Sequence, residues 1–261
     1  MEKAKSAAGS QSLQRGLEIL EILDKSTTPL GVREIGRQLG LNATIVQRLI
    51  NTLAQYSYVM QDGETRRYSI GYRAFGLGWS LIKKDRLISV VKPELDQLAS
   101  QHLLNGYLGV LRGSRAVYIL STQSEGPIVI RSVPGSETYL HSTALGKVLL
   151  AGLPEEEAFR LLTQEPLVQV TPRTKTDVAE LMEELKDVRS RGYAMVHSEN
   201  IQGVISVGAP IRDATDTTVA ALSTAFAEWS APDFDLAQII ALVKETTRRI
   251  SRSIGNHREM P

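Results

Sequence analysis

The sequence has 261 residues, 42% of them hydrophobic, and contains no cysteine. This length and composition are typical of a globular protein with one large domain or two ordinary ones. The lack of cysteine excludes disulfide staples, thiol catalysis and thiolate metal sites. There is no run of about eighteen apolar residues, and the polar residues 1–10 lack the apolar core of a signal peptide. We therefore expect a cytoplasmic protein with a disordered tail at residues 1–10 and no membrane partner.

The net charge of +1 hides an asymmetry along the chain. Residues 1–86 contain 13 Lys and Arg against 8 Asp and Glu, whereas the remainder contains 17 against 21. A basic first third suits a polyanion such as DNA, although an imbalance of this size also arises by chance. Charge alone therefore supports a nucleic-acid partner only weakly.

Three helices are predicted in the first 55 residues. Leucines and isoleucines at a helical period predict an amphipathic helix over residues 12–24. A second, short helix over residues 32–39 ends at Gly40, and Asn42 suits the N-cap of a third helix that runs to about residue 55. About three residues separate the second and third helices, which is the spacing of a helix-turn-helix.

The third helix has two chemically different faces. At 100° per residue, its apolar residues share one face, and the other face carries Thr44, Gln47, Arg48 and Asn51. Amide side chains suit adenine in the major groove, and arginine suits guanine or phosphate. The alternative is an ordinary surface helix of a small bundle, whose free face is more often rich in Glu and Lys.

A β-hairpin is predicted directly after this helix. The β-prone runs 58–61 and 66–70 flank Asp62-Gly63-Glu64-Thr65, in which Asp-Gly is a strong hairpin signal. A hairpin at this place is a wing, so we predict a winged helix-turn-helix over residues 11–72. Arg66 and Arg67 are expected on the returning strand, at a phosphate backbone or simply in solvent. The predicted DNA contacts are Arg33, Asn42, Thr44, Gln47, Arg48, Asn51, Arg66 and Arg67.

The rest of the chain is predicted to be a linker helix and an α+β domain. Residues 73–84 are too apolar for a flexible tether and are expected to form a packed linker helix. A helix over residues 86–102 contains Pro93, which breaks it, kinks it or begins a new helix. In residues 85–256 we then expect strands at 107–111, 116–121 and 128–133, helices at 142–150, 154–162 and 177–191, strands at 193–197, 204–211 and 218–226, and a helix at 234–254. This mixed order predicts an antiparallel sheet.

Motifs along the whole chain resemble those of the IclR family of transcription regulators. They are the runs 32–41, 141–151, 171–174 and 189–193, followed by Glu199, Gly203, Ala209-Pro210 and 220–223. Each motif alone is weak, but their common order is specific. The resemblance implies a winged helix-turn-helix, a linker helix that dimerises the DNA-binding parts, and a GAF-like C-terminal domain that binds an effector. It also implies repressors, activators or both, assembled as homodimers or tetramers.

The candidate effector site combines small-residue strands with a helix N-terminus. Alternation places Val204, Ser206 and Gly208 on one face of their strand, and Val219, Ala221, Ser223 and Ala225 on one face of the next. Such faces form a pocket floor or make room for a closely packed helix. The amides that open the helix near Ala144 attract an anion.

The resemblance implies that Ala144, Leu145, Val196, Ser206 and Ser223 line the effector cavity, and Ala225 joins them on the small-residue face. The family often has an acidic residue at the position of Val196 and an arginine at that of Ile205, so this pocket is expected to be less polar. We expect a carboxylic or aromatic acid as effector.

The sequence gives little support to an enzymatic function. His141 and Ser142 are adjacent, which does not align a catalytic pair, and Gly146-Lys147 lacks the other residues of a phosphate-binding loop. The four histidines lack metal-ligand spacing. We therefore expect a non-enzymatic, ligand-responsive regulator of a small-molecule catabolic pathway that binds double-stranded operator DNA and needs no cofactor. The alternatives are a hydrolase on a GAF-like domain and a ligand-independent DNA-binding protein.

Overall fold

The structure is a computed structural model that describes residues 9–124, 130, 132–228 and 235–256. The chain divides into two compact units, residues 1–84 and 85–261. Most of the predicted N-terminal tail, residues 1–8, lies outside the described residues.

The N-terminal unit contains the predicted helix-turn-helix. Its elements are α1 (Gln11–Lys25), α2 (Val32–Leu39), α3 (Ala43–Gln55), β1 (Val59–Gln61), β2 (Tyr68–Ile70) and α4 (Tyr72–Lys84). Gly40 ends α2 with φ of 65°, in the left-handed region that favours glycine. The Oδ1 of Asn42 accepts a hydrogen bond from the N–H of Ile45 at 2.9 Å. Both helix boundaries are therefore confirmed.

A small core holds these elements together. Buried side chains from α1, α2, α3 and both strands pack into one cluster: Ile19, Leu23, Ile35, Val46, Ile50, Val59 and Tyr68. Because this cluster takes up the apolar face of α3, the opposite face stays at the surface. Thr44, Arg48 and Asn51 are exposed on it and Gln47 is half-buried, as the helical period predicted.

The wing differs from the prediction in the length of its turn. β1 and β2 pair antiparallel with Val59 opposite Ile70. The returning strand begins only at Tyr68, so the prediction that Arg66 and Arg67 lie on it is wrong. The Asp62 carboxylate closes the turn by accepting hydrogen bonds from the N–H (2.7 Å) and the hydroxyl (2.6 Å) of Thr65. Arg66 follows with φ of 58°, which prevents it from continuing a strand.

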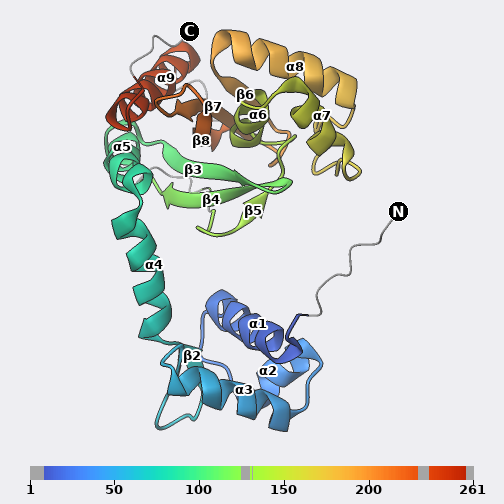
Figure 1. Cartoon of the computed structure of the whole chain (residues 1–261), viewed down its shortest axis with the longest axis vertical. Coiled ribbons are helices and arrows are strands. Elements are labelled where there is room, and N and C mark those ends of the chain that lie inside the picture. The colour runs from blue at the N-terminus through green and yellow to red at the C-terminus, as the bar shows by residue number, and fades with distance from the viewer. Residues whose placement is uncertain (1–8, 125–129, 131, 229–234, 257–261) are drawn as a thin grey trace. The chain divides into compact units, whose positions relative to one another are not determined.

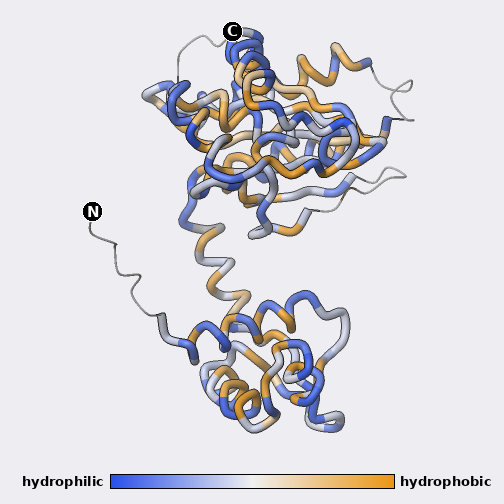
Figure 2. The backbone as a smooth tube through the Cα atoms, turned by 90° about the vertical axis from the view of Figure 1, so that its right-hand side faces the viewer, coloured by the Kyte–Doolittle hydropathy of each residue, from blue (hydrophilic) through white to orange (hydrophobic). Residues whose placement is uncertain are grey.

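The predicted linker helix forms, but its described side chains do not join the core of the N-terminal unit. Large apolar side chains of α4 are exposed, and Figure 2 colours much of this helix as apolar. Phe75 is 68% exposed and Leu81 69%, and on α1 Leu13 is 64% exposed. Within the N-terminal unit the expectation of a packed helix is therefore wrong, because none of these side chains belongs to its core.

The C-terminal unit is an α+β domain around an antiparallel sheet (Figure 1). Its elements are α5 (Arg86–His102), β3 (Asn105–Arg112), β4 (Arg115–Thr122), β5 (Glu137–Thr138), α6 (Ala144–Ala151), α7 (Glu155–Thr163), α8 (Val178–Arg191), β6 (Ala194–His197), β7 (Val204–Arg212), β8 (Thr218–Ala227) and α9 (Leu236–Ser253). Within the described residues the strand order is β5-β4-β3-β8-β7-β6. Pro93 lies inside α5, which continues as one helix.

Two hydrophobic clusters cover the two faces of this sheet. Helices α5 and α9 pack on one face, on which Val207, Ala209 and Ile211 alternate along β7. Helices α6, α7 and α8 cover the other face, toward which Val196 and Ala221 point. The layers are visible in Figure 1. The alternating residues of β7 therefore belong to two different layers, as a strand covered on both sides requires.

Two details of the prediction need correction in this unit. Residues 128, 129 and 131 of the strand expected at 128–133 lie outside the described residues, and the described Ile130, Ser132 and Val133 are not in a strand. The short β5 pairs with β4 instead. The helix expected from Ser142 begins at Ala144, because the hydroxyl of Thr143 accepts a hydrogen bond from the N–H of Gly146 and caps it.

Helix α6 approaches its neighbours unusually closely. A Cβ on Gly146 would lie 2.5 Å from the Cα and the carbonyl oxygen of Leu140. A Cβ on Gly208 of β7 would lie 3.1 Å from the backbone of Ala144. The backbone contact leaves no room for a side chain at Gly146, and at Gly208 a side chain fits only if α6 shifts by a few tenths of an ångström.

We predict that Gly146→Ala lowers the free energy of unfolding of the C-terminal unit by about 1–3 kcal/mol, because the added methyl overpacks a backbone contact. Urea unfolding followed by circular dichroism measures the loss. Gly76→Ala is the matched control, since a Cβ at Gly76 in α4 meets nothing within 4 Å, and alanine favours a helix. Equal stability of Gly146→Ala and the wild type would contradict the close approach of α6.

Candidate functional site

The N-terminal unit carries an open groove between α2 and α3. Residues from the start of α2 and the outer face of α3 line it: Val32, Arg33, Ala43, Thr44, Gln47, Arg48 and Asn51. The groove thus brings together Arg33 with the four residues predicted on the free face of α3. Asn42 lies beside it, but its side-chain oxygen is engaged in capping α3.

The wing helps to orient the side chains of this groove. The Nε2 of Gln47 donates to the Oδ1 of Asn51 at 2.8 Å and to the hydroxyl of Tyr68 at 3.1 Å. Tyr68 belongs to β2 and is 4% exposed, so it is a rigid anchor. The two amide side chains predicted to face bases are therefore held in one hydrogen-bonded row.

The two wing arginines have different environments. Arg67 donates to both carboxylate oxygens of Glu34 at 3.0 and 3.2 Å and to the carbonyl of Pro29 at 3.0 Å. The N–H of Gly31 and then the Arg67 guanidinium lower the pKa of Glu34. Arg67 therefore ties the wing to the start of α2, whereas Arg66 is exposed in the turn. A phosphate contact by either arginine stays a prediction.

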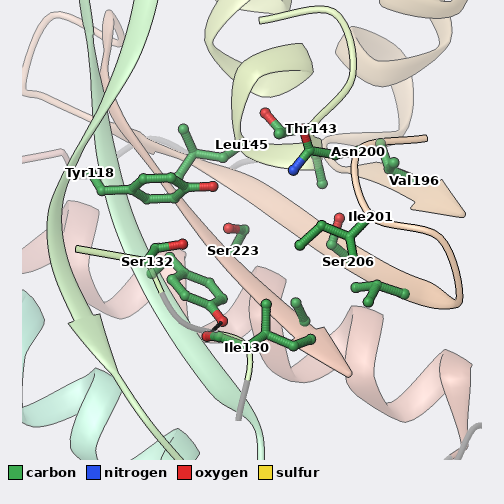
Figure 3. Close-up of a pocket in the computed structure, with 14 residues that line it drawn as sticks. Tyr118, Ile130, Ser132, Thr143, Leu145, Val196, Asn200, Ile201, Ser206 and Ser223 are labelled. Atoms are coloured by element: carbon green, nitrogen blue, oxygen red, sulfur yellow. Dashed lines mark hydrogen bonds between the residues drawn. The ribbon is translucent and has the colours of Figure 1, made fainter. Parts of the chain in front are cut away.

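The C-terminal unit contains a pocket between α6 and the sheet (Figure 3). All of the predicted effector-binding residues line it: Ala144, Leu145, Val196, Ser206, Ser223 and Ala225. The other lining residues were not predicted from the sequence: Tyr107, Tyr118, Ile130, Ser132, Thr143, Asn200, Ile201 and Val204. The cavity volume is about 60 Å³. At 10–15 Å³ for each water-sized sphere, this is room for roughly four to six waters, which suits a small ligand.

The strand register explains the pocket floor. β7 and β8 pair antiparallel, with Ser206 opposite Ala225 and Gly208 opposite Ser223. The sequence left two interpretations of these small residues open, and each holds at a different position. At Gly208 the small residue admits the backbone of α6. At Ser206 and Ser223 the small side chains leave unfilled space, which is the cavity.

The N-terminus of α6 opens onto the pocket. The first helical hydrogen bond runs from the N–H of Lys147 to the carbonyl of Thr143 at 2.9 Å, and Gly146 is bonded to the Thr143 hydroxyl. The N–H groups of Ala144 and Leu145 precede these bonds in the helix. Such amides and the helix dipole favour a negative charge. Among the described lining residues none is Asp, Glu, Lys or Arg, so the rest of the wall suits an uncharged body.

An aromatic wall closes the pocket on the side of β3 and β4. The rings of Tyr107 and Tyr118 lie 5.7 Å apart at 57°. The Tyr107 hydroxyl donates to the carbonyl of Ile130, and burial, followed by the neighbouring Tyr118, raises the pKa of this phenol. Period-2 alternation along the predicted strands would have shown which of their residues share a face. The pairing of β3 with β8, which brings Tyr107 opposite Ser223, has no local sequence signal.

His141 and His197 both have partners within the C-terminal unit. His141 is 3% exposed and its Nε2 lies 3.0 Å from the carbonyl of Val168. His197 lies at the surface, where its Nε2 is 2.7 Å from the Glu228 carboxylate. The described residues contain no cluster of three or more His, Asp or Glu side chains that could hold a metal ion. In the same part of the chain, no helix has the length and apolar character needed to span a bilayer.

Comparisons with known proteins cover both units. Residues 12–63 match the family described as IclR helix-turn-helix domain, and residues 80–252 match Bacterial transcriptional regulator IclR C-terminal. The HTH-type transcriptional repressor AllR of Escherichia coli (strain K12) is 30% identical over 250 residues, which are 95% of this chain and 91% of that protein.

Two solved structures are also similar. The crystal structure of the Thermotoga maritima IclR has a TM-score of 0.80 and 28% identity, covering 94% of this chain and 98% of that chain. An IclR homolog from Microbacterium hydrocarbonoxydans, complexed with 4-hydroxybenzoate, has a TM-score of 0.78 at 20% identity, covering 93% of this chain and 98% of that one. At this identity the second likeness concerns the fold alone.

The environment of His141 predicts a pH dependence of stability. Burial lowers the pKa of its ring below the ordinary value of 6.5, although the bond to Val168 opposes the shift. Below pH 6.5 the unfolded chain therefore binds a proton that the folded chain does not, and stability falls as the pH decreases through this window. We predict that His141→Gln, whose amide can still donate to Val168, loses less stability than the wild type between pH 7.5 and 5.5.

Chemical denaturation at the two pH values measures this difference. His102→Gln is the control, because His102 is exposed at the end of α5. If the His141→Gln variant and the wild type lose equal stability on acidification, His141 does not titrate as its burial requires.

Proposed function

Because the chain belongs to the IclR family of bacterial transcriptional regulators, we propose that its pocket binds a small organic acid that controls how the winged helix-turn-helix binds operator DNA. The observation that carries this proposal is the N-terminus of α6, where Ala144 and Leu145 line a cavity whose described wall residues carry no charge. A carboxylate is the group that such a terminus favours. The genes controlled are then those of a small-molecule catabolic pathway.

The shape and chemistry of the cavity restrict the effector further. The carboxylate lies at the start of α6, and the apolar body lies against Leu145 and Val196. Hydroxyls of Ser206 and Ser223 on the floor are available for one further polar group. The cavity of about 60 Å³ favours a small acid. 4-Hydroxybenzoate, found in the Microbacterium protein, is a suitable first probe.

The N-terminal unit supplies the DNA contacts in this proposal. α3 enters the major groove with Thr44, Gln47, Arg48 and Asn51, and the exposed Arg66 of the wing contacts phosphate. Arg33, at the exposed start of α2, neutralises a further phosphate. Asn42 contributes mainly through the cap that begins α3, and Arg67 mainly through its tie to Glu34.

The protein acts as a homodimer or a tetramer in the cytoplasm, where its DNA target lies. The exposed apolar side chains of α4, such as Phe75 and Trp79, together with Leu13 and Leu17 of α1, suit contact with a second copy. A twofold dimer presents two recognition helices to two half-sites. The effector then acts by changing the geometry in which these helices are presented.

We predict that Arg48→Ala weakens binding to specific operator DNA by about 1–3 kcal/mol if its guanidinium reads a base. If Arg48 contacts only phosphate, the loss is similar for all sequences. Fluorescence anisotropy with operator and scrambled duplexes measures both. Lys25→Ala is the control for simple loss of charge, since Lys25 ends α1 and does not line the groove. Unchanged affinity for all DNA would remove Arg48 from the interface.

We predict that Ser206→Leu and Ser223→Leu abolish effector binding, because the larger side chain fills the cavity. A thermal-shift screen of carboxylic and aromatic acids, beginning with 4-hydroxybenzoate, identifies a ligand that raises the melting temperature of the wild type. That increase should disappear in both variants, while DNA binding by the separate N-terminal unit persists. Ser190→Leu, at the exposed surface of α8, should keep the increase. A normal response of folded Ser→Leu variants would place the ligand elsewhere.

A further inference from the structure

A cluster of charged side chains is buried beside the pocket without lining it. Lys147, in the middle of α6, has a side chain with 0% exposure. Its Nζ donates to both carboxylate oxygens of Glu184 at 2.9 and 2.8 Å and to both of Glu199 at 2.9 and 2.8 Å. Lys175 lies 3.2 Å from Glu184 on the outer side. One ammonium therefore joins three parts of the chain: α6, α8 and the segment that follows β6.

Glu199 belongs to a segment that forms part of the pocket wall. We name residues 198–203, between β6 and β7, the pocket loop. Its Asn200 and Ile201 line the cavity (Figure 3). Ile201 is 44% exposed, so this part of the wall lies at the mouth. The loop consequently lies where the cavity meets the solvent, and its position decides whether this part of the wall is complete.

The conformation of the pocket loop requires outside restraint. Ser198 has φ of 60°, in a region that costs energy for a residue with a Cβ. The hydroxyl of Thr171 donates to the carbonyl of Ser198 at 2.6 Å, and that of Thr174 donates to the carbonyl of Glu199 at 2.6 Å. These bonds hold the backbone of the loop at its beginning. On its buried side, the loop is restrained by the ion pair between Glu199 and Lys147.

The same arrangement orients Asn200. The hydroxyl of Ser142 donates to its Oδ1 at 3.1 Å, and Figure 3 shows the side-chain nitrogen of Asn200 turned toward the cavity. The amide therefore presents a hydrogen-bond donor to the pocket, near the N-terminus of α6. This donor stays in place only while the loop keeps its position.

The charge of Glu199 favours the loop position in which its carboxylate is paired with Lys147. A buried carboxylate is costly unless a cation and hydrogen bonds compensate for the lost water. Burial raises the pKa of Glu199, and the Lys147 ammonium acts in the opposite direction. Moving the loop away would separate Glu199 from this cation. Glu184 would still neutralise Lys147, so the ion pair with Glu199 can be removed without leaving the ammonium unpaired.

We propose that Lys147 is a positioning residue of the effector site, which acts through its ion pair with Glu199 to hold the pocket loop over the cavity. The assignment of an acid to this cavity rests on the proposed function above. The restraint on the loop does not, since it is a property of the protein without a ligand. The two can therefore fail separately.

Hydrogen–deuterium exchange of the full-length protein tests the restraint. In the wild type, the N–H of Ser198 is bonded to the carbonyl of Val204 at 2.8 Å, and that of Gly203 to the Ser198 hydroxyl at 3.0 Å. Glu199→Gln keeps the shape of the side chain and removes its charge, and we expect exchange of peptides covering residues 198–204 to accelerate at least tenfold. Exchange in α8 and β8 should change far less.

Glu184→Gln is the matched control. It removes the negative charge of one of the two carboxylates that face the Lys147 ammonium, but it leaves Glu199 paired. The pocket loop should therefore keep its wild-type exchange. Glu199→Asp retains the charge with a shorter reach and should lie between the wild type and Glu199→Gln, which preserves the comparison if Glu199→Gln fails to fold. Unchanged loop exchange in the folded Glu199 variants, or equal acceleration throughout the unit, would overturn the proposal.

Titration with 4-hydroxybenzoate provides the second readout. If the loop is a working part of the wall, Glu199→Gln should weaken binding at least tenfold while Glu184→Gln stays within about twofold of the wild type. Equal weakening in both variants would mean a general loss of stability and would count against a positioning role. Absence of binding to the wild type would count against the proposed effector class and would leave the exchange result to decide the role of Lys147.

Discussion

The arrangement of the C-terminal unit depends on the close approach of α6 to the sheet. Gly208 admits the backbone of Ala144, and Gly146 admits the backbone of Leu140. This approach places the first amides of α6 directly above the small residues of β7 and β8. The cavity exists because the helix ends its close contact at Gly208 and the floor continues as Ser206 and Ala225. A helix held farther away by larger residues would leave a groove open to water in place of a pocket.

Burial of Lys147 follows from the same approach, because the centre of α6 is covered by α8 and by the pocket loop. Two carboxylates share its ammonium. Ion pairs in such places are weak evidence of stability, since desolvation offsets much of the attraction. Their value here is geometric. The ammonium specifies which carboxyl-bearing segments meet at the middle of α6, and one of those segments completes the pocket wall.

The N-terminal unit shows how a short wing can be tied to the exposed face of a helix-turn-helix. Tyr68 of β2 holds Gln47, and Arg67 holds Glu34 at the start of α2. Wing and helices are thus connected by side chains as well as by the small core. A change in the wing would alter the orientation of the α3 side chains even where the wing itself touches no base.

Local patterns in the sequence predict most of this structure. Helical periods, the Gly40 stop and the Asn42 cap are local signals, and the helices of the N-terminal unit begin and end close to where these signals place them. Strand alternation likewise identified Ser206, Ser223 and Ala225, and the family resemblance supplied Val196 and Leu145. The prediction that Arg67 lies on the returning strand was wrong, because the turn is longer than Asp-Gly alone suggests. Hydrogen bonds between Asp62 and Thr65 close this longer turn.

Features made by distant parts of the chain had no such signal. Tyr107 reaches the pocket through the pairing of β3 with β8, and the partners of Lys147 are 37 and 52 residues away. The apolar residues of α4 led to the prediction of a packed helix. Such a pattern does not reveal whether the side chains are buried.

The most direct test of the account is a crystal structure of the protein bound to the acid that most raises its melting temperature. We predict that the carboxylate accepts hydrogen bonds from the N–H groups of Ala144 and Leu145, with the body of the acid against Leu145 and Val196. A ligand bound outside this cavity, or bound within it with its carboxylate away from α6, would contradict the account.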